Sequence, residues 1–371
     1  MTSGPGQHAA AAAADAQRVD AEALRSYAES ALASAGAGAE DAAAWADLML
    51  HASLRGVDSH GVASLLPVFC EQALAGIGAP ATAPAVAEER GSVRVVEGRR
   101  AGGARTARLA MDAACELAHR NGVGATVAGS IGYFGSLAWT VEPAALDGLL
   151  GLCACNAMAF VAPEGGREAL HGTNPIAVAI PAEPDPIVVD MRTNAFRMAD
   201  YRTGLAEGRP LPDGVLLGPE GEFVTDVAVL EQLGWERAVS LPAAGAKGYG
   251  LALVVDVLTA ALAGTPVGRE IRGWASEHAG LAAFFLAVDP AAFGPVERFA
   301  GTVARLAEQV HETVPLDEGV PVRLPGERAA AERRTRLARG VPFEPGPWER
   351  MESELRALGL EPPERPGATR P

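Results

Sequence analysis

The chain has 371 residues, of which 49% are hydrophobic and 21% charged, so it is long enough for two or three domains with a well-buried core. Its formal net charge of −15 argues against nucleic acid as a partner, because binding to phosphates needs a basic surface. No apolar run is long enough to cross a membrane, and residues 1–14 are alanine-rich without any Lys or Arg. We therefore expect no transmembrane helix and no signal peptide, and a cytoplasmic protein.

The cysteines argue against a disulfide framework or a metal site. Cys153 and Cys155 are one residue apart inside an apolar run, which is a poor geometry for a disulfide and too few ligands for zinc. Cys70 and Cys115 stand alone. We expect all four to be buried thiols in a reducing compartment, with no metal bound.

The chain begins with helical patterns and then changes to a mixture of strands and helices. Apolar residues spaced by three and four predict two helices within 15–54 and another from about 63 to 75, while 1–14 is interpreted as a disordered tail. Strands are predicted at 93–98, 124–128, 148–157, 175–181, 187–190 and 284–288. Further helices are predicted at 103–120, 250–262, 295–311 and 347–358. Residues 204–240 are predicted to be loop with short pieces of structure, and the Pro-rich residues 360–371 a disordered tail.

The common cofactor signatures are missing from this chain. No G-x-G-x-x-G lies between a strand and a helix, since Gly122-Val123-Gly124 lacks the third glycine at the right offset. There is also no phosphate-binding P-loop, no G-x-S-x-G elbow and no H-E-x-x-H. A Rossmann dehydrogenase or a kinase is therefore not indicated.

Two polar clusters in apolar surroundings have both a functional and a structural interpretation. In Asp58-Ser59-His60-Gly61 the histidine is the natural proton donor near neutral pH, and Ser59 could orient its ring. The same residues also suit a Ser cap and a satisfied His at a helix start. Gly172-Thr173-Asn174-Pro175, preceded by His171, suits a site wall or an ordinary turn.

Two more clusters point to anion or ribose binding. Asp190 ends an apolar strand, where a ribose hydroxyl is often held, although a helix cap is an equal alternative. The segment Gly245–Gly250 places Lys247 among glycines at a predicted helix N-terminus, which attracts anions. Lys247 is the single lysine of the chain, and we interpret it as functional.

Taken in order, these segments resemble the malate/L-lactate dehydrogenase type-2 family. That family includes ureidoglycolate and sulfolactate dehydrogenases, diketogulonate reductase and piperideine/pyrroline-2-carboxylate reductases. The resemblance covers roughly residues 20–345. It rests on Arg55-Gly56-Val57-Asp58-Ser59-His60-Gly61, Tyr133-Phe134-Gly135, Asn156, Gly172-Thr173-Asn174-Pro175, Asp190-Met191, Lys247-Gly248-Tyr249-Gly250-Leu251 and Pro325-Gly326-Glu327.

The resemblance implies an α/β (α+β) fold with two parts. One is a non-Rossmann NAD(P)-binding domain on a large mixed sheet, expected over 86–299. The other is a helical lobe formed by both chain ends, expected over 15–85 and 300–359. The resemblance also implies a homodimer.

The chemistry implied by the resemblance is hydride transfer between NAD or NADP and a 2-oxo acid or cyclic 2-imino acid. His60 would donate the proton, with Ser59 orienting it. The cofactor would contact Asn156, Asp190, Met191, Arg192, Thr193, Asn194, Lys247, Gly248, Gly326 and Glu327.

Departures from the family pattern concern the substrate. Ser64 stands where the family usually has an Arg that grips the substrate carboxylate. Tyr133 stands where a His is usual, and could itself donate a proton or a hydrogen bond, although its ordinary pKa near 10 makes it a weaker acid. His171 replaces a residue that is usually apolar. We expect the substrate to meet Arg55, Ser64, His171 and Thr173.

Three functions remain open from the sequence. The first is a reductase of a 2-oxo acid or related carbonyl, with an atypical substrate. The second is a cyclic imino-acid reductase. The third is a family member that has lost catalysis, which the intact Ser59-His60, Asp190 and Lys247 oppose.

Overall fold

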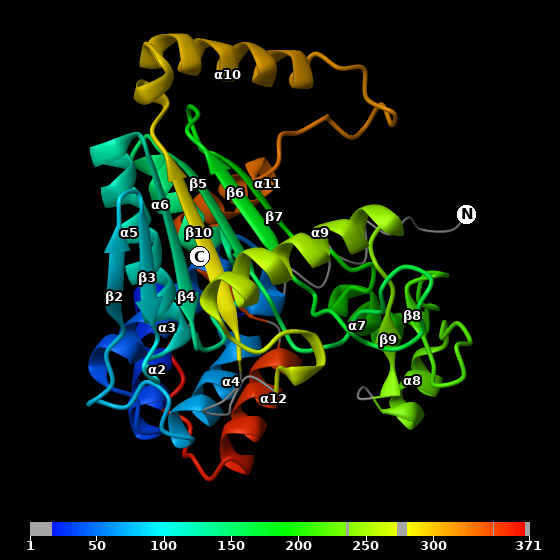
Figure 1. Ribbon diagram of the computed structural model, residues 1–371. Helices are drawn as coiled ribbons and strands as arrows, with labels where there is room; N and C mark the ends of the chain where they lie inside the picture. Colours follow the sequence, from blue (N-terminus) through cyan, green and yellow to red (C-terminus); the bar gives the residue numbers. More distant parts are fainter. Residues whose placement is uncertain (1–16, 235–236, 273–279, 344, 368–371) are drawn as a thin grey trace.

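The computed structural model describes residues 17–234, 237–272, 280–343 and 345–367 (Figure 1). The expected tail 1–14 lies outside the described residues. A seven-stranded sheet forms the centre, in the order β2-β3-β4-β10-β5-β6-β7. Its strands are β2 (Ala85–Arg90), β3 (Val93–Glu97), β4 (Val123–Gly129), β5 (Leu150–Cys155), β6 (Ile176–Ile180), β7 (Ile187–Met191) and β10 (Ala282–Val288).

The sheet is mixed, as expected, and not of the Rossmann type. Only β3 and β4 pair in parallel among the strands of this sheet, and every other neighbouring pair is antiparallel. A Rossmann sheet is mostly parallel, with helices in the crossovers. The prediction of a large mixed sheet is therefore confirmed.

Helices cover both faces of the sheet. α5 (Gly103–Asn121) and α6 (Ala138–Leu146) lie on one face, and α9 (Ala246–Asp256), which continues through a π-helical stretch at Val257–Ala261, crosses the other (Figure 1). Glycines on β4 mark both contacts. A Cβ on Gly124 would lie 2.1 Å from the carbonyl oxygen of Ala114 in α5. A Cβ on Gly129, which points to the opposite face, would lie 3.3 Å from Thr265 beyond α9.

Both chain ends meet in a helical layer below the sheet. α2 (Ala21–Ser34), α3 (Ala39–Leu54) and α4 (Val62–Leu74) pack together, α11 (Glu327–Arg339) packs on α3, and α12 (Pro345–Ala357) packs on α4. A short antiparallel pair, β1 (Gln17–Val19) with β11 (Val341–Phe343), joins the two ends directly. One cluster of buried apolar side chains runs from this layer into the sheet, including Trp45, Leu66 and Phe285. The layer and the sheet therefore share a core.

Two details of the expected carboxy-terminal part differ from the structure. α10 (Val296–His311) has no buried residue and stands apart from the helical layer at the top of Figure 1, so the range 300–359 does not form one lobe. The expected tail 360–371 is held in place as far as residue 367. Arg365 donates to both carboxylate oxygens of Glu352 at 2.7 Å, which ties this segment to α12.

Residues 196–234 and 237–240 form a separate small unit between β7 and α9. Its elements are α7 (Met198–Glu207), β8 (Leu216–Leu217), α8 (Val227–Leu233) and β9 (Val239–Ser240). It has its own cluster of buried residues, which includes Phe196, Leu216 and Leu230. The remaining short elements are the 3-10 turns η1 (Asp58–His60), η4 (Gly268–Glu270) and η5 (Pro290–Phe293).

The contact at Gly124 leads to a prediction about stability. Gly124→Ala should destabilise the fold by about 1–3 kcal/mol, because the added methyl group meets the backbone of α5, which cannot move aside as a flexible side chain would. The free energy of unfolding in urea measures this. Gly301→Ala in the exposed helix α10 is the matched control and should be neutral or stabilising. Equal effects of the two substitutions would contradict the close contact.

Candidate active site

The predicted site segments converge on one edge of the sheet because of the strand directions. β10 runs antiparallel to both β4 and β5, so β4 and β5 share a direction, and β7 shares it through β6. The carboxyl ends of β4, β5 and β7 therefore meet the amino ends of β6 and β10 at the same edge. The segments around Tyr133, Asn156, Thr173 and Asp190 all lie at these ends. This edge is the candidate site.

The Ser59–His60 pair is built into the 3-10 turn η1. Ser59 Oγ lies 3.0 Å from His60 Nδ1, and both side chains are half-buried. A serine hydroxyl that donates to Nδ1 leaves the ring proton on Nε2, which is the arrangement of a proton donor. The turn precedes α4, and Gly61 is required there, since a Cβ would lie 2.5 Å from Ser53 Oγ.

The loop 130–137 connects this helical layer to the end of β7. Tyr133 stacks on Phe69 of α4 with ring centroids 5.9 Å apart. Three residues further on, Ser136 Oγ donates to Asp190 Oδ2 at 2.8 Å, and the backbone N–H of Ala138 donates to the same oxygen at 2.9 Å. Asp190 thus ends β7 and also accepts from the first N–H of α6, which is a helix-capping contact.

Tyr133 is a poor candidate for proton donation. Burial raises the pKa of its phenol well above the ordinary value, with smaller contributions from Cys155 and Asp190. A phenol with a raised pKa stays protonated and can donate a hydrogen bond, but it gives up its proton less readily than an imidazole. Between the two, the geometry favours His60 as the acid.

The stretch 190–194 divides into an outward and an inward part. Asp190, Met191 and Arg192 are exposed. Thr193 and Asn194 are buried; Thr193 Oγ1 donates to the carbonyl of Thr173 at 3.0 Å, and Asn194 Nδ2 donates to Ser240 Oγ at 2.9 Å. All five residues of this stretch were expected to touch the cofactor. The first three are exposed, and the hydrogen bonds of the last two hold the segment in place.

Lys247 and Gly248 form the first turn of α9, directly against this stretch. Ala243 N donates to the carbonyl of Thr193 at 2.9 Å, and a Cβ on Gly248 would lie 2.5 Å from the same carbonyl oxygen. Gly248 is therefore required by the packing. Lys247 is exposed and makes no hydrogen bond or ion pair with the described residues. The hydrogen bond between Ala243 and Thr193 therefore joins the segment that carries Lys247 to the segment that carries Arg192.

Arg192 is a cation without a compensating partner. It forms no hydrogen bond or ion pair within the described part of the chain, and Arg197 nearby is already paired with Asp200. Partial burial, and after it the charge of Arg197, hold the pKa of Arg192 below its ordinary value. Such a guanidinium gains from an incoming anion.

Asn156 follows β5 and is almost fully buried. Its Oδ1 accepts from the backbone N–H of Ala282 at 2.7 Å, which locks it between β5 and β10. Its Nδ2 is buried and has no hydrogen-bond partner among the described residues. A buried amide donor without a partner costs free energy, so a hydrogen-bond acceptor that reached this atom would be bound favourably.

His171 belongs to a buried polar network that the sequence did not reveal. Its Nδ1 lies 2.6 Å from Asp256 Oδ2 of α9, while Asn174 Nδ2 donates to Asp256 Oδ1 at 2.9 Å. The Nε2 of His171 is buried without a partner in the described structure, and the ring lies beside that of Tyr249 at 5.6 Å. Asp256 was detectable as a charged residue in the strongly apolar helix predicted at 250–262, which suggests a buried partner.

Arg55, which was expected to meet the substrate, pairs with a carboxylate of the protein in this structure. It is buried, and its Nη1 donates to Glu142 Oε1 of α6 at 2.9 Å. His51 Nε2 lies 2.5 Å from the other carboxylate oxygen of Glu142. Burial alone would raise the pKa of Glu142, but the hydrogen bond and charge of His51, followed by the charge of Arg55, hold it below its ordinary value. Arg55 thus stabilises the α3–α6 contact instead.

Three further predicted residues have local structural roles. Ser64 Oγ donates to the backbone carbonyl of Asp58 at 2.7 Å, which closes the His60 turn. Gly326, with a φ of 93°, lies against β7, where Val188 N donates to the carbonyl of Pro325. Both oxygens of Glu327 are occupied, one by His311 and one by the backbone N–H of Leu324.

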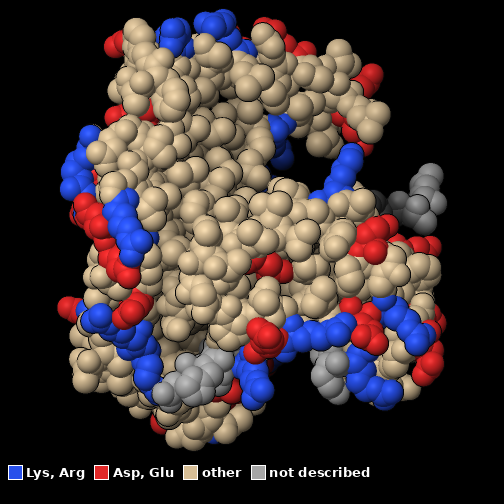
Figure 2. Space-filling model, viewed as in Figure 1, with Lys and Arg blue, Asp and Glu red and all other residues tan. Residues whose placement is uncertain are grey.

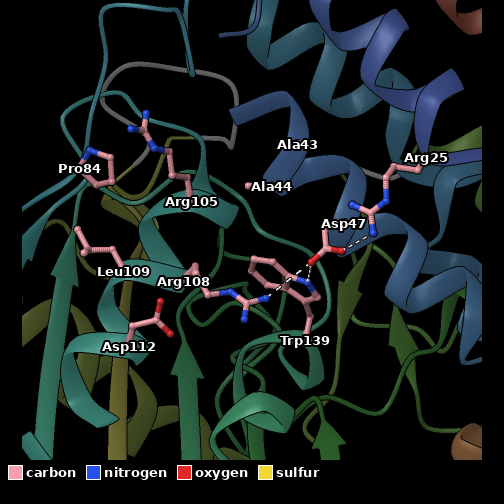
Figure 3. A pocket seen from close by; sticks show the side chains of 10 residues that line it. All are labelled: Arg25, Ala43, Ala44, Asp47, Pro84, Arg105, Arg108, Leu109, Asp112 and Trp139. Carbon is pink, nitrogen blue, oxygen red and sulfur yellow. Dashed lines mark hydrogen bonds and ion pairs between the residues drawn. The ribbon is translucent and has the colours of Figure 1, made fainter. Parts of the chain in front are cut away.

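A hollow of about 630 Å³ lies elsewhere, between α2, α3, α5 and α6. Figure 3 shows Asp47 at its centre, where it accepts from Arg25 and Trp139, with Arg108 lying over the Trp139 ring. These charges satisfy one another, and none of the predicted site residues lines the hollow. A second hollow of about 580 Å³ reaches Gly245, just before the first turn of α9.

Comparisons with known proteins identify the class to which this fold and site belong. A family model described as malate/L-lactate dehydrogenase matches residues 19–352. Malate dehydrogenase of Pyrococcus horikoshii is 28% identical over 93% of this chain and 96% of its own length. Ureidoglycolate dehydrogenase (NAD(+)) of Escherichia coli O157:H7 is 30% identical over 87% and 92%. The structure of Δ1-piperideine-2-carboxylate reductase from Pseudomonas syringae superposes with a TM-score of 0.80 at 26% identity, and the superposition covers 91% of this chain and 99% of that one.

The chain therefore belongs to the malate/L-lactate dehydrogenase family, a family of oxidoreductases that use nicotinamide cofactors. The resemblance inferred from the motifs is confirmed, and with it the expectation of an enzyme. No helix within the described residues is long and apolar enough to cross a membrane.

The Arg55–Glu142 pair yields a prediction about stability and pH. Glu142→Gln should lower the free energy of unfolding by about 3 kcal/mol near neutral pH, because it leaves Arg55 buried without a countercharge. Since the folded pKa of Glu142 is depressed, the stability that its ionised form contributes is present above its unfolded pKa of about 4.3. It is lost as the pH falls through the folded pKa.

Denaturant unfolding at several pH values tests this prediction. The difference between wild type and Glu142→Gln should be constant above about pH 5 and shrink in more acidic buffer. Glu88→Gln, at an exposed ion pair with Arg90, is the control and should change little. A similarly small effect of Glu142→Gln at neutral pH would show that Arg55 is not committed to this pair.

Proposed function

We propose that this protein is an NAD(P)H-dependent oxidoreductase that reduces a 2-oxo acid or a related carbonyl compound to the 2-hydroxy compound. The observation that carries the proposal is the Ser59–His60 pair, which is arranged as a proton donor. The pair belongs to the helical layer, and the loop that contacts this layer is hydrogen-bonded to Asp190 through Ser136. The reverse reaction, oxidation of the hydroxy compound, uses the same groups. Membership of the family supports the class of reaction.

The residues at the sheet edge fit a nicotinamide dinucleotide. Arg192 and Lys247 are exposed cations with no partner in the described structure, on adjoining segments, and suit phosphate groups. Asp190 is exposed at the end of a strand and suits a ribose hydroxyl. The unpartnered Nδ2 of Asn156 suits a carbonyl acceptor. Because both an acid and a guanidinium are present, the set admits NAD and NADP.

The chain's own residues would handle the proton. The nicotinamide supplies the hydride when it is bound. His60 gives its Nε2 proton to the substrate oxygen as negative charge develops there, and Ser59 keeps the ring in the tautomer that carries this proton. The substrate carbon gains a hydride and its oxygen gains a proton, so the two-electron reduction balances.

The substrate is proposed to differ from that of the family's typical members. Ser64 replaces the usual carboxylate-binding Arg and is bonded to the backbone of its own turn. Arg55 cannot replace that Arg, since it is paired with Glu142. Among the residues expected to meet the substrate, His171 and Thr173 remain candidates, and the unpartnered Nε2 of His171 is the polar atom best placed to await a ligand.

A cyclic imino-acid reductase is the alternative, supported by the structural similarity to Δ1-piperideine-2-carboxylate reductase. The same His60 would then protonate nitrogen instead of oxygen. A screen of 2-oxo acids alone, and of 2-oxo acids with amines that form imines, separates the two functions by which set consumes NAD(P)H faster.

We also propose that the enzyme is a homodimer and works in the cytoplasm. α9 and its continuation expose a stripe of large apolar side chains, and Figure 2 shows few charges over the face that this helix crosses. Such an exposed apolar stripe suits burial against a second copy. The stripe consists of Leu251, Leu253, Val254, Val257 and Leu262. The four free cysteines suit a reducing compartment.

Cofactor binding can be measured without a substrate. Titration of the protein fluorescence with NADH and NADPH should give micromolar binding to one or both. Arg192→Ala and Lys247→Ala should each weaken it about tenfold, or about 1.4 kcal/mol, through loss of a phosphate contact. Arg90→Ala, an exposed cation elsewhere, controls for net charge. Binding of neither nucleotide would favour a family member that has lost catalysis.

The role of His60 is tested with the best substrate of the screen. His60→Gln should lower kcat by about a hundredfold or more, the usual contribution of a general acid, while the Kd for the cofactor stays within about twofold. His119→Gln, an exposed histidine paired with Asp147, should leave kcat unchanged. Full activity of His60→Gln would remove this residue from the mechanism.

A further inference from the structure

Arg336 reaches the His60 turn from the other end of the chain. It lies in α11, and its side chain is only 8% exposed. Its Nη1 donates to the backbone carbonyl of Ser53 at 2.6 Å and to Asp58 Oδ1 at 2.7 Å, while Nη2 lies 3.4 Å from Asp58 Oδ2. Its Nε donates to Glu332 Oε1 at 2.6 Å. A planar guanidinium thus grips the first residue of the turn Asp58–His60 at two points.

The remaining contacts of the turn come from the neighbouring helices α3 and α4. Ser53 Oγ accepts from the backbone N–H of Val62, immediately after the turn. The hydroxyl of Ser64 bonds to the carbonyl of Asp58. Ser53 therefore joins both ends of the turn, since its carbonyl also accepts from Arg336. Arg336 completes this set of contacts from α11, although it lies 283 residues after Ser53 in the chain.

The charge of Arg336 matters as much as its geometry. Asp58 is two residues before His60, and an unbalanced carboxylate there would favour the imidazolium form of His60. Other charged groups on the elements packed around the turn include Glu332 and Arg333 on α11 and the His51–Arg55–Glu142 cluster between α3 and α6, where the charge of Arg333 helps to lower the pKa of Glu142. That cluster is internally paired, and α4 begins without a charged residue in its first two turns. Arg336 is thus the group in contact with Asp58 that balances its charge.

We propose that Arg336 is a positioning residue for His60: by gripping Asp58 it fixes the orientation of the Ser59–His60 turn and keeps the Asp58 charge from altering the proton affinity of His60. Arg336 is assigned no contact with substrate or cofactor. The proposal rests on the proposed role of His60 as the proton donor. A purely structural Arg336 would contribute to stability but would leave the titration of His60 unchanged.

The test measures the pKa of His60 directly, by NMR of the histidine ring signals, with the His60 signal assigned by its loss in His60→Gln. Arg336→Met should raise the pKa of His60 by about half a unit, the effect of one nearby carboxylate at a partly exposed site. Asp58→Asn should lower it, because the guanidinium is then unbalanced. The double variant should return close to the wild-type value. Arg334→Met, an exposed arginine on the same helix, is the matched control for net charge and should have no effect.

The outcomes separate this proposal from the proposed function. Opposite shifts for Arg336→Met and Asp58→Asn, cancelling in the double variant, support the coupling whether or not a substrate is known. If Arg336→Met does not fold, Asp58→Asn and the charge-retaining Arg336→Lys carry the test: the first should lower the pKa of His60 and the second should keep it. An unchanged pKa of His60 in Asp58→Asn, or in Arg336→Met where that variant folds, overturns the proposal, even if His60→Gln abolishes turnover.

A second readout uses turnover once a substrate is found. Arg336→Lys retains the charge but not the two-point grip, so kcat should fall about tenfold while the Kd for NADH is unchanged. A loss of cofactor binding that parallels the loss of kcat would indicate a general disturbance of the fold instead, and would overturn the positioning role.

Discussion

The pairing of β10 between β4 and β5 is the constraint on which the candidate site depends. Because β10 runs antiparallel to both neighbours, β4 and β5 point the same way, and the β5–β6–β7 meander brings β7 into the same direction. Segments from four parts of the chain consequently end at one edge. Side-chain contacts then fasten them together: Asn156 to Ala282, Asp190 to the start of α6, and Thr193 to Thr173. The proposed dinucleotide site would thus be assembled without the parallel crossover of a Rossmann fold.

The helical layer carries His60, the proposed proton donor. His60 lies on a short turn whose shape depends on Gly61 and Ser53, and whose first residue is gripped by Arg336 from α11. The two chain ends meet through β1 and β11, so the late helices are in reach of the early turn. The same region holds the buried Arg55–Glu142–His51 cluster, which joins α3 to α6. Polar groups that a sequence-based interpretation assigns to the substrate here stabilise the contact between layers.

The polar residues of the site fall into two groups by burial. Asp190, Arg192 and Lys247 are exposed and suit a ligand. Thr193, Asn194, Asn174 and Asp256 are buried and hold the exposed ones in position. Asn156 Nδ2 and His171 Nε2 share a property with each group. Both atoms are buried, but neither has a hydrogen-bond partner among the described residues. A buried donor or acceptor that the protein does not satisfy is where a ligand or water gains most.

The sequence by itself determined the family, the mixed α/β class and most of the helices and strands, because apolar periodicity and ordered motifs are local properties of the chain. It did not reveal β2, α6 or α11. β2 is an exposed edge strand without apolar alternation, α6 contains Pro143, and α11 buries only Ala330 and Arg336 among its described residues. Pairings between distant charges were beyond it as well. The pairing of Arg55 with Glu142, and that of Glu327 with His311, arises only when helices far apart in the chain pack together. Composition and spacing carry no information about which charges that packing buries side by side.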